Sequence, residues 1–403
     1  MKKVAAKHGM TCLLTEKPFE YLNGSGKHNN WSLSTNFGHN LFNPGKSPED
    51  NAQFLLMLAA VIAAVDKHQD LLRISVAHAS NDHRLGANEA PPAIISMYLG
   101  DELTGILQAI ADGRTYSTRA KCDVKIGVHV LPTFAMDSAD RNRTSPFAFT
   151  GNKFEFRMPG ASQTIADVNT VLNTIMAEEF KLFADELEKS KDLSEGIAAI
   201  IKRVMQEHGK IIFNGNNYSK DWEHEAERRG LLNLKTTIDA LEHLCDEKNV
   251  KLFKDMGVFT ETELRSRQEI DVERYCKEVC LEATTMLDIA TKDIIPAALT
   301  YKKDVATGAY NSISAGISAD VEVELANKIE ALVKTALRSV DNLKSALEDA
   351  HKFGFGFEGG KHCKNAVIPA MDDLRAICDE MELTVAKSYW PMPNYSDVLF
   401  SVH

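Results

Sequence analysis

The chain has 403 residues, of which 26% are charged and 44% hydrophobic, and this composition is typical of a globular protein with large cores. The net charge of −11 argues against a general nucleic-acid-binding protein, although a local group of arginines can still attract an anionic substrate. The longest apolar run, residues 54–65, is too short to span a membrane and predicts a buried helix.

Seven cysteines are scattered along the chain without a C-x-x-C pair. This pattern predicts reduced thiols and a cytoplasmic protein, and the residues after Met1 do not form a secretory signal. Cys276 and Cys280 lie four residues apart on an expected helix, where core packing is favoured over a metal or redox site.

Helix and strand signals alternate over the first 185 residues. Ser47 precedes a proline and two acidic residues, which is typical of an N-cap before a helix, and apolar residues follow at helical spacing. A second helix is expected from Pro91 to about Ile110. Apolar residues then alternate over positions 124–130 and predict a strand.

A second alternating pattern occupies residues 153–157. Phe154 and Phe156 alternate with Lys153, Glu155 and Arg157, so a strand here would send the phenylalanines into the core and the charged residues to the opposite face. By pattern alone, the charged face could be a solvent-exposed ladder or the wall of a cleft.

From about residue 181 onward the signals are almost entirely helical. Thr260 and Glu263 have the spacing of a capping box, and Pro296 is expected to break or kink the helix that follows. An apolar stripe over residues 321–347 and another helix over residues 365–387 predict an antiparallel helical hairpin. The sequence therefore predicts a catalytic portion at residues 1–185 and an all-helical domain at residues 186–403.

Three segments carry residues suited to a charged substrate. The first is Asn23-Gly-Ser-Gly-Lys-His28, in which glycines allow close approach of the backbone to a ligand and His28 could hold a metal. The other two occupy residues 81–91 and 141–157. In this order the three segments resemble the active-site motifs of glutamine synthetase. The match is closest to its long type III branch and extends from about Lys2 to Tyr395.

The resemblance implies an α+β fold, in which part of the glutamine synthetase catalytic split β-barrel/α fold is followed by an all-helical C-terminal domain. It implies ATP-dependent ligation of ammonia to L-glutamate through a γ-glutamyl phosphate, with Mg²⁺ or Mn²⁺ as the metal. The expected partners are glutamate, ammonia and ATP, with neither nucleic acid nor membrane. The full-length protein is expected to form stacked hexameric rings.

The resemblance also assigns roles to individual residues. Imidazole and carboxylate ligands suit Mg²⁺ or Mn²⁺, arginine forks suit carboxylates and phosphates, and a mobile carboxylate suits proton transfer from ammonium. The implied metal ligands are His28 and Glu155, the catalytic residues Glu89 and Arg143, the substrate-binding residues Asn23, Gly24, Arg84 and Arg157, and the nucleotide-binding residues Ser32 and Lys153. Alone, Asn23 could equally be a turn residue, His28 a loop residue bonded to its own backbone, and Glu89 a first-turn acid.

Two positions depart from the family pattern. Asn30 and Ala148 stand where many relatives have a histidine and a phosphate-binding arginine, respectively. Lys27 or Lys153 is expected to replace the positive charge of the missing arginine. Family members also place metal-binding glutamates before the glycine loop, which is residues 23–28 here. We therefore expect an N-terminally truncated chain with an incomplete site and little activity. The alternatives are a non-catalytic assembly or regulatory fragment, and another carboxylate–amine ligase of the same superfamily.

Overall fold

The computed structural model describes residues 1–19, 21–114, 142–393 and 397. The chain divides into two compact units, one of residues 14–268 and one of residues 1–13 together with residues 269–403. This division lies inside a single long helix, α11 (Glu261–Ile289). The boundary at residue 185 between a catalytic and a helical domain stays a prediction. The strand expected at residues 124–130 lies outside the described residues.

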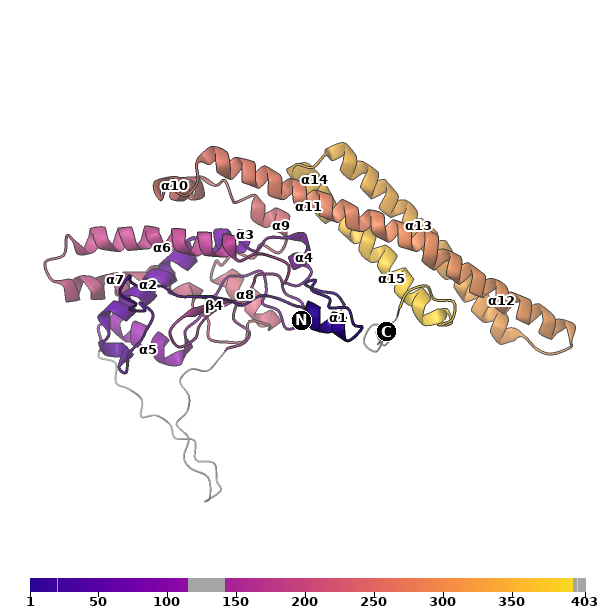
Figure 1. The fold of residues 1–403 in the computed structure, drawn as a ribbon, viewed down its shortest axis with the longest axis horizontal. Helices are drawn as coiled ribbons and strands as arrows, with labels where there is room; N and C mark the ends of the chain where they lie inside the picture. The colour runs from indigo at the N-terminus through magenta and orange to yellow at the C-terminus, as the bar shows by residue number, and fades with distance from the viewer. Residues whose placement is uncertain (20, 115–141, 394–396, 398–403) are drawn as a thin grey trace, which may run out of the picture. The chain divides into compact units, whose positions relative to one another are not determined.

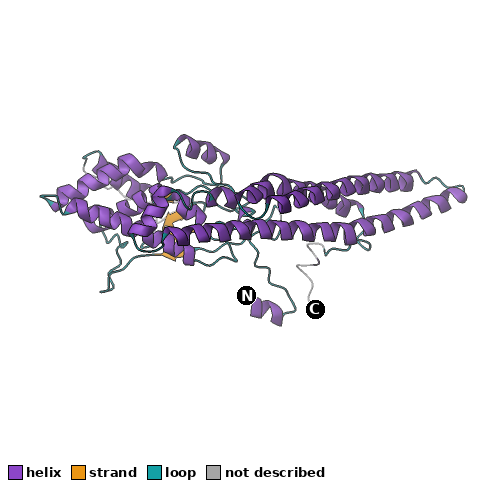
Figure 2. Cartoon of the chain, turned by 90° about the horizontal axis from the view of Figure 1, so that it is seen from above, coloured by secondary structure: helices purple, strands orange, loops and turns teal. Residues whose placement is uncertain are grey.

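In its described residues, the unit of residues 14–268 combines four short strands with many helices (Figures 1 and 2). Its elements before the start of α11 are β1 (Asn29–Trp31), η1 (Pro48–Asp50), α2 (Ala52–Lys67), α3 (Gln69–Ile74), α4 (Ala79–Asp82), β2 (Met97–Tyr98), α5 (Gly100–Ala111), β3 (Phe147–Phe149), β4 (Phe154–Phe156), α6 (Ala166–Leu187), α7 (Leu193–His208), η2 (Gly209–Ile211), α8 (Lys220–Arg228), α9 (Thr237–Leu241) and α10 (Glu247–Asp255).

The strands form one sheet in the order β1-β4-β3-β2, with β4 antiparallel to both of its neighbours and β2 parallel to β3. Phe154 and Phe156 on β4 are fully buried, as their alternation predicts, and Phe154 stacks on Phe147 with ring centroids 4.8 Å apart. Trp31 and Phe42 complete the aromatic core around β4. The opposite face of this central strand is therefore left to polar side chains.

The apolar helix α2 is the main helical support of this core. Its side chains from Phe54 to Val65 are almost all buried, and it packs against α6 and α7. The expected start of this helix was wrong. Ser47 makes no side-chain cap, residues 48–50 form a short 3₁₀ turn, and Asn51 Oδ1 instead accepts the Phe54 backbone N–H at 3.0 Å. Asn51 is the cap because it lies directly before the helical residues.

The helix expected from Pro91 begins at Gly100 instead. Residues 97–98 pair with β3 as strand β2, and sheet pairing thus takes precedence over the helical pattern of the sequence. The two prolines favour the same outcome, because proline disfavours helical geometry in the residue before it. At the N-terminus, residues 2–7 form helix α1 (Lys2–Lys7), and the following residues 8–17 contain no strand.

In the unit containing residues 269–403, helices are joined by turns and loops, and the described residues contain no strand. After α11 it contains η3 (Ala290–Ile294), α12 (Ile295–Ser314), α13 (Asp320–Phe353), α14 (Phe357–His362), η4 (Cys363–Val367) and α15 (Ile368–Thr384). α13 packs against both α12 and α15, which gives the antiparallel arrangement expected from the sequence (Figure 1). The fold is therefore α+β, with a small sheet in one unit and helices in the other.

Two turns of π-helix interrupt the long helices of this unit. They are η3 and η4, and each is followed two residues later by a proline, Pro296 or Pro369. A proline has no N–H for the carbonyl four residues earlier, and that carbonyl lies inside the π turn in both cases. The interruption expected at Pro296 is thus present as a π turn just before it.

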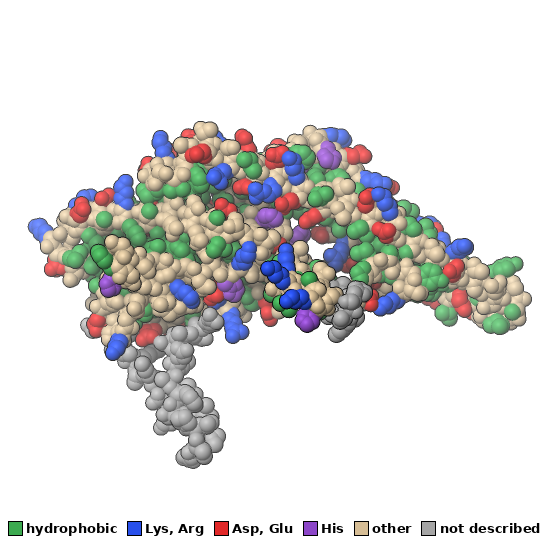
Figure 3. All heavy atoms as spheres, in the orientation of Figure 1, with side chains coloured by type: hydrophobic (Ala, Val, Ile, Leu, Met, Phe, Trp, Pro, Cys, Tyr) green, Lys and Arg blue, Asp and Glu red, His purple; other side chains and the backbone are tan. Residues whose placement is uncertain are grey.

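The apolar stripe of α13 is buried over its middle but not at its start. Ile329, Ala336 and Leu343 are fully buried, whereas Val321 in the first turn is 75% exposed. Tyr310, Ile313 and Ile317 around the turn from α12 are also exposed, so hydrophobic side chains reach the surface at this end of the hairpin (Figure 3). Cys276 and Cys280 are buried, in agreement with the core-packing interpretation.

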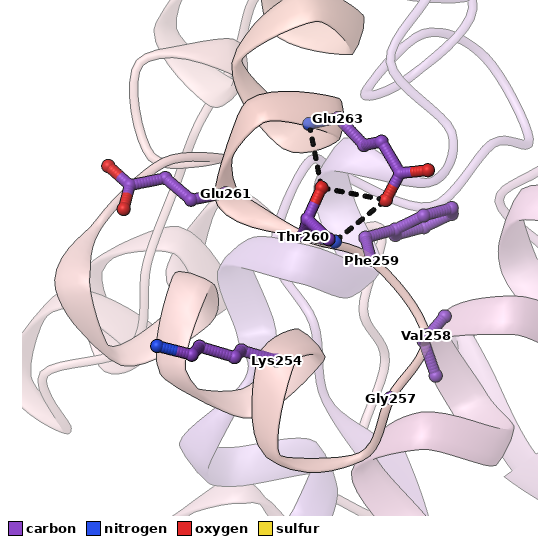
Figure 4. Close-up of a pocket in the computed structure, with 7 residues that line it drawn as sticks. All are labelled: Lys254, Gly257, Val258, Phe259, Thr260, Glu261 and Glu263. Atoms are coloured by element: carbon purple, nitrogen blue, oxygen red, sulfur yellow. Dashed lines mark hydrogen bonds between the residues drawn. The ribbon is translucent and has the colours of Figure 1, made fainter.

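Thr260 and Glu263 form the capping box at the start of α11. Glu263 Oε2 accepts the Thr260 backbone N–H at 2.8 Å, and Thr260 Oγ1 accepts the Glu263 N–H at 3.3 Å (Figure 4). The sequence-based expectation of a helix start at this point is therefore confirmed. None of the described helices is long and apolar enough to cross a membrane.

The buried aromatic core gives a prediction for stability. Phe154→Ala should lower the free energy of unfolding by about 3–5 kcal/mol, because it leaves a cavity beside β4. Urea unfolding followed by tryptophan fluorescence measures this, since Trp31 is part of the same cluster. Phe37→Ala is the matched control, because Phe37 is 82% exposed. Equal midpoints for the two variants would contradict the proposed core.

Candidate active site

A buried carboxylate on the central strand β4 organises the polar face of the sheet. Glu155 Oε1 lies 2.8 Å from His28 Nδ1, and its other oxygen accepts a hydrogen bond from Arg157 Nη2 at 2.7 Å. The Glu155 side chain is 7% exposed, whereas that of His28 is 53% exposed. Burial alone would raise the pKa of Glu155, but the bonds from Arg157 and His28 outweigh it and hold this pKa below its ordinary value.

The strand register places both departures from the family pattern beside this carboxylate. Asn30 on β1 and Ala148 on β3 are the residues directly opposite Glu155. Opposite residues of neighbouring strands share one face of a sheet, so Asn30, Glu155 and Ala148 form a row across it. Arg157 is the cation in contact with Glu155, whereas Lys153 Nζ donates to Thr150 Oγ1 at 2.9 Å.

The guanidinium groups of Arg84 and Arg157 are buried and bind backbone carbonyl oxygens. Arg84 donates to the carbonyls of Arg157 at 2.9 Å and Met158 at 3.0 Å, and Arg157 donates to those of Asn142 and Ser145. Both arginine side chains therefore fix the segments around β4. The Nε atom of Arg157 is buried and has no hydrogen-bond partner among the described residues. The proposed binding of substrate by these arginines requires some of the carbonyl bonds to be exchanged.

The glycine loop is held against the chain that follows β4. Lys27 N donates to the Pro159 carbonyl at 2.9 Å, and Ser25 N donates to the Glu16 carbonyl at 2.8 Å. A side chain at Gly24 would collide with the Glu16 carbonyl, and one at Gly26 would collide with the guanidinium of Arg84. Both glycines are thus required by close packing of the loop backbone.

Glu16 is a buried acid that joins the start of this unit to the loop after β4. It is 1% exposed, and its carboxylate accepts hydrogen bonds from the backbone N–H and the hydroxyl of Ser162. Burial raises the pKa of Glu16, but the bonds from Ser162 and Ser80 outweigh this and lower it overall. The sequence places Glu16 near the glycine loop without showing this partner.

The turn that contains Glu89 lies against the glycine loop. Asn23 Nδ2 donates to Glu89 Oε2 at 2.6 Å, and Asn88 Nδ2 donates to Asn23 Oδ1 at 2.8 Å. Glu89 has φ = 52°, a left-handed backbone conformation that is uncommon for a residue other than glycine. The Tyr218 hydroxyl donates toward the backbone carbonyls of Glu89 at 3.0 Å and Arg143 at 3.3 Å.

The remaining implied residues lie nearby in the sheet or its loops. Ser32 Oγ donates to Asn40 Oδ1 at 3.0 Å and approaches the Asn152 carbonyl. Arg143 is exposed, and only its backbone carbonyl takes part in the hydrogen bonds given above. The structure thus joins Asn23 to Glu89 and His28 to Glu155 and Arg157. It does not join Ser32, Lys153 or the Arg143 side chain to these groups through a hydrogen bond.

His28 and Glu155 are chemically suited to a hard divalent cation. Two neighbouring ligands of an octahedral ion, each about 2.1 Å from it, lie about 3.0 Å apart. The 2.8 Å separation of Nδ1 and Oε1 is compatible with this geometry. Over residues 1–19, 21–114, 142–393 and 397, no group of three or more histidine, cysteine or acidic side chains is placed to hold an ion. The pair therefore fits as part of a metal site.

A surface pocket lies apart from the implied site residues. It has a volume of about 430 Å³ and is lined by residues of the α10–α11 turn and the start of α11, including Lys254, Phe259 and Glu263 (Figure 4). None of the residues that the sequence implicates in chemistry lines it.

Two family models match the chain, the glutamine synthetase catalytic domain over residues 1–98 and the glutamine synthetase C-terminal domain over residues 196–312. A type-3 glutamine synthetase of Dictyostelium discoideum is 42% identical, over 99% of this chain and 56% of its own length. Glutamine synthetases of Butyrivibrio fibrisolvens and Bacteroides fragilis (strain YCH46) are 39% and 38% identical, over all of this chain and 58% and 57% of their own lengths. The chain belongs to the glutamine synthetase family.

Membership of the glutamine synthetase family confirms the resemblance on which the site assignment rests. The chain spans 56–58% of the length of these curated relatives. The candidate site also contains residues that the sequence did not single out, among them Tyr218 and Ser162. These residues lie outside the sequence motifs, and only their contacts with distant segments place them at the candidate site.

The lowered pKa of Glu16 gives a pH-dependent prediction. A carboxyl whose pKa is lower in the folded chain stabilises it above the ordinary pKa of about 4.3, and this contribution is lost as pH falls through the folded pKa. Glu16→Gln should therefore lower the free energy of unfolding by about 2 kcal/mol at pH 7, and the difference from wild type should shrink below about pH 4.

Urea unfolding at pH 7 and at pH 3.5 measures this difference. Glu188→Gln provides the control, because Glu188 is exposed and should change stability little at either pH. A difference between Glu16→Gln and wild type that is the same at both pH values would exclude an electrostatic role for the carboxylate.

Proposed function

We propose that the chain forms part of an active site that ligates ammonia to L-glutamate, with ATP as the source of a γ-glutamyl phosphate. One observation carries the proposal beyond family membership. Two contact pairs join segments far apart in the sequence, Asn23 with Glu89 and His28 with Glu155. These are the residue types that phosphoryl transfer followed by attack of an amine requires.

His28 and Glu155 would hold Mg²⁺ or Mn²⁺. The bound ion would neutralise phosphate oxygens while the γ-phosphoryl group moves from ATP to the glutamate carboxylate. Arg157 keeps Glu155 ionised, and an ionised carboxylate is the form that binds a metal. The exposed Arg143 would pair with the transferring phosphoryl group, and Ser32 and Lys153 would contact the nucleotide.

Glu89 would receive a proton as ammonia attacks the acyl phosphate. Its carboxylate is held by Asn23, so its position relative to the glycine loop is fixed. A carboxylate also attracts ammonium, and the same group can serve binding and proton transfer. Asn23 and Gly24 would contact the amino-acid substrate, and Arg84 and Arg157 would bind its carboxylates in forked geometry after releasing backbone carbonyls.

We also propose that the full-length protein is cytoplasmic and assembles into stacked hexameric rings, as the family resemblance implies. Native mass spectrometry of the full-length protein tests this assembly. A monomer at micromolar concentration would contradict it.

Metal binding provides the first test. His28→Ala and Glu155→Ala should each weaken Mn²⁺ binding at least about tenfold, because each removes one proposed ligand. Electron paramagnetic resonance of free Mn²⁺ measures the affinity. His8→Ala is the control, because His8 is exposed and lies in the other compact unit. Unchanged affinity in both site variants would refute the proposed metal ligands.

Turnover provides the second test. In the full-length protein, Glu89→Gln should lower the rate of glutamine formation by about 10²–10⁴-fold without changing ATP affinity, because it removes the proton acceptor and leaves the nucleotide contacts intact. Formation of ¹⁵N-glutamine from glutamate, ATP and ¹⁵N-ammonium is measured by mass spectrometry, with Glu348→Gln in the helical unit as the control. Product from a different acid or amine, and none from glutamate and ammonia, would assign another ligase reaction.

A further inference from the structure

Tyr218 lies at a position where its hydroxyl connects two segments of the proposed site. The hydroxyl is 3.0 Å from the carbonyl oxygen of Glu89 and 3.3 Å from that of Arg143. These residues lie 129 and 75 positions away in the sequence. The segments contribute the proposed proton acceptor and the proposed phosphoryl-binding arginine, and the phenol touches the backbone of both.

The backbone around Tyr218 is anchored on each side. Tyr218 N donates to Asn216 Oδ1 at 3.0 Å, and Asn217 N donates to Thr144 Oγ1 at 3.0 Å. The buried side chain of Asn217 accepts a hydrogen bond from Ser96 Oγ at 2.7 Å. The phenol is thus presented from a fixed support just before α8.

A phenol has one proton, so the two carbonyls share a single donor. Burial raises the pKa of Tyr218, Arg157 lowers it and Glu89 raises it, and the net result is a pKa above its ordinary value. The hydroxyl therefore stays protonated at neutral pH and must act as a donor. A short bond to one carbonyl weakens the bond to the other, which couples the two segments.

The turn at Glu89 needs such support. Its left-handed backbone, at φ = 52°, is strained for a residue with a side chain, and such strain persists only where surrounding contacts hold it. Asn23 holds the Glu89 side chain, and Tyr218 holds its backbone carbonyl. Loss of either contact would remove one of the two restraints on the Glu89 turn.

We infer that Tyr218 is a positioning residue that holds the Glu89 turn and the Arg143 segment in register through its single hydroxyl proton. The role in catalysis rests on the proposed function, whereas the mechanical coupling of the two segments does not. Tyr218→Phe removes only the hydroxyl and keeps the ring, so it separates this contact from packing.

Hydrogen–deuterium exchange of the full chain tests the coupling without relying on activity. In Tyr218→Phe, amide exchange should rise about fivefold in peptides covering residues 86–90 and residues 142–146, the factor expected for loss of one hydrogen bond. Peptides from α13 should be unchanged, as should the melting temperature. Tyr310→Phe is the control, because Tyr310 is 71% exposed in the helical unit.

Faster exchange that is confined to the two site peptides supports the inference. Faster exchange in neither peptide, or in only one, overturns the coupling, and a uniform increase over the whole chain shows a merely structural role. Where the protein turns over, Tyr218→Phe should raise KM for ammonium at least threefold and leave KM for ATP unchanged. Coupled exchange in a full-length protein that forms no glutamine would refute the proposed function and leave the positioning role of Tyr218 standing.

Discussion

The buried carboxylate of Glu155 is the constraint on which the arrangement around the sheet depends. A charge in the protein interior must be paired, because an unpaired one costs several kcal/mol in lost hydration. Arg157, directly after β4, supplies the pairing charge, and His28 approaches from the glycine loop. Arg157 in turn binds the carbonyls of Asn142 and Ser145, so one carboxylate orders three separate segments.

The two faces of β4 carry different kinds of side chain, an aromatic core on one side and the charged site candidates on the other. Phe154 and Phe156 anchor it in an aromatic core, which fixes the backbone and hence the direction of Glu155 and Arg157. Arg84 adds a second tie, because it binds the carbonyls that follow β4 and fills the space that a side chain at Gly26 would occupy. Rigid support of this kind is what a site needs if its charged groups are to keep their geometry.

The sequence was most informative where a local pattern decides the structure. The alternation around Phe154, the capping box at Thr260 and the apolar helix after Asn51 each depend on residues within a few positions of one another. The helix expected from Pro91 was wrong because residues 97–98 pair with β3, about fifty positions further along the chain. The contacts of Glu16 and Tyr218 span 146 and 129 positions, and no periodicity could reveal them. The motifs identified segments that the structure brings into contact, whereas the engagement of Arg84 and Arg157 with backbone carbonyls came from the structure alone.

The two π turns have a consequence for how the helical unit can vary. Each turn contains one residue more than an α-helical path would use, and one residue rotates everything after it by about 100° around the helix axis. The buried face of α12 is therefore rotated relative to that of α11. One helical period fitted to the sequence of both helices would assign the wrong residues to the buried face of one of them. Deletion of one residue within residues 290–294 would restore a continuous helix and turn the buried side of α12 away from α13. The length of these segments is thus under tighter constraint than their composition.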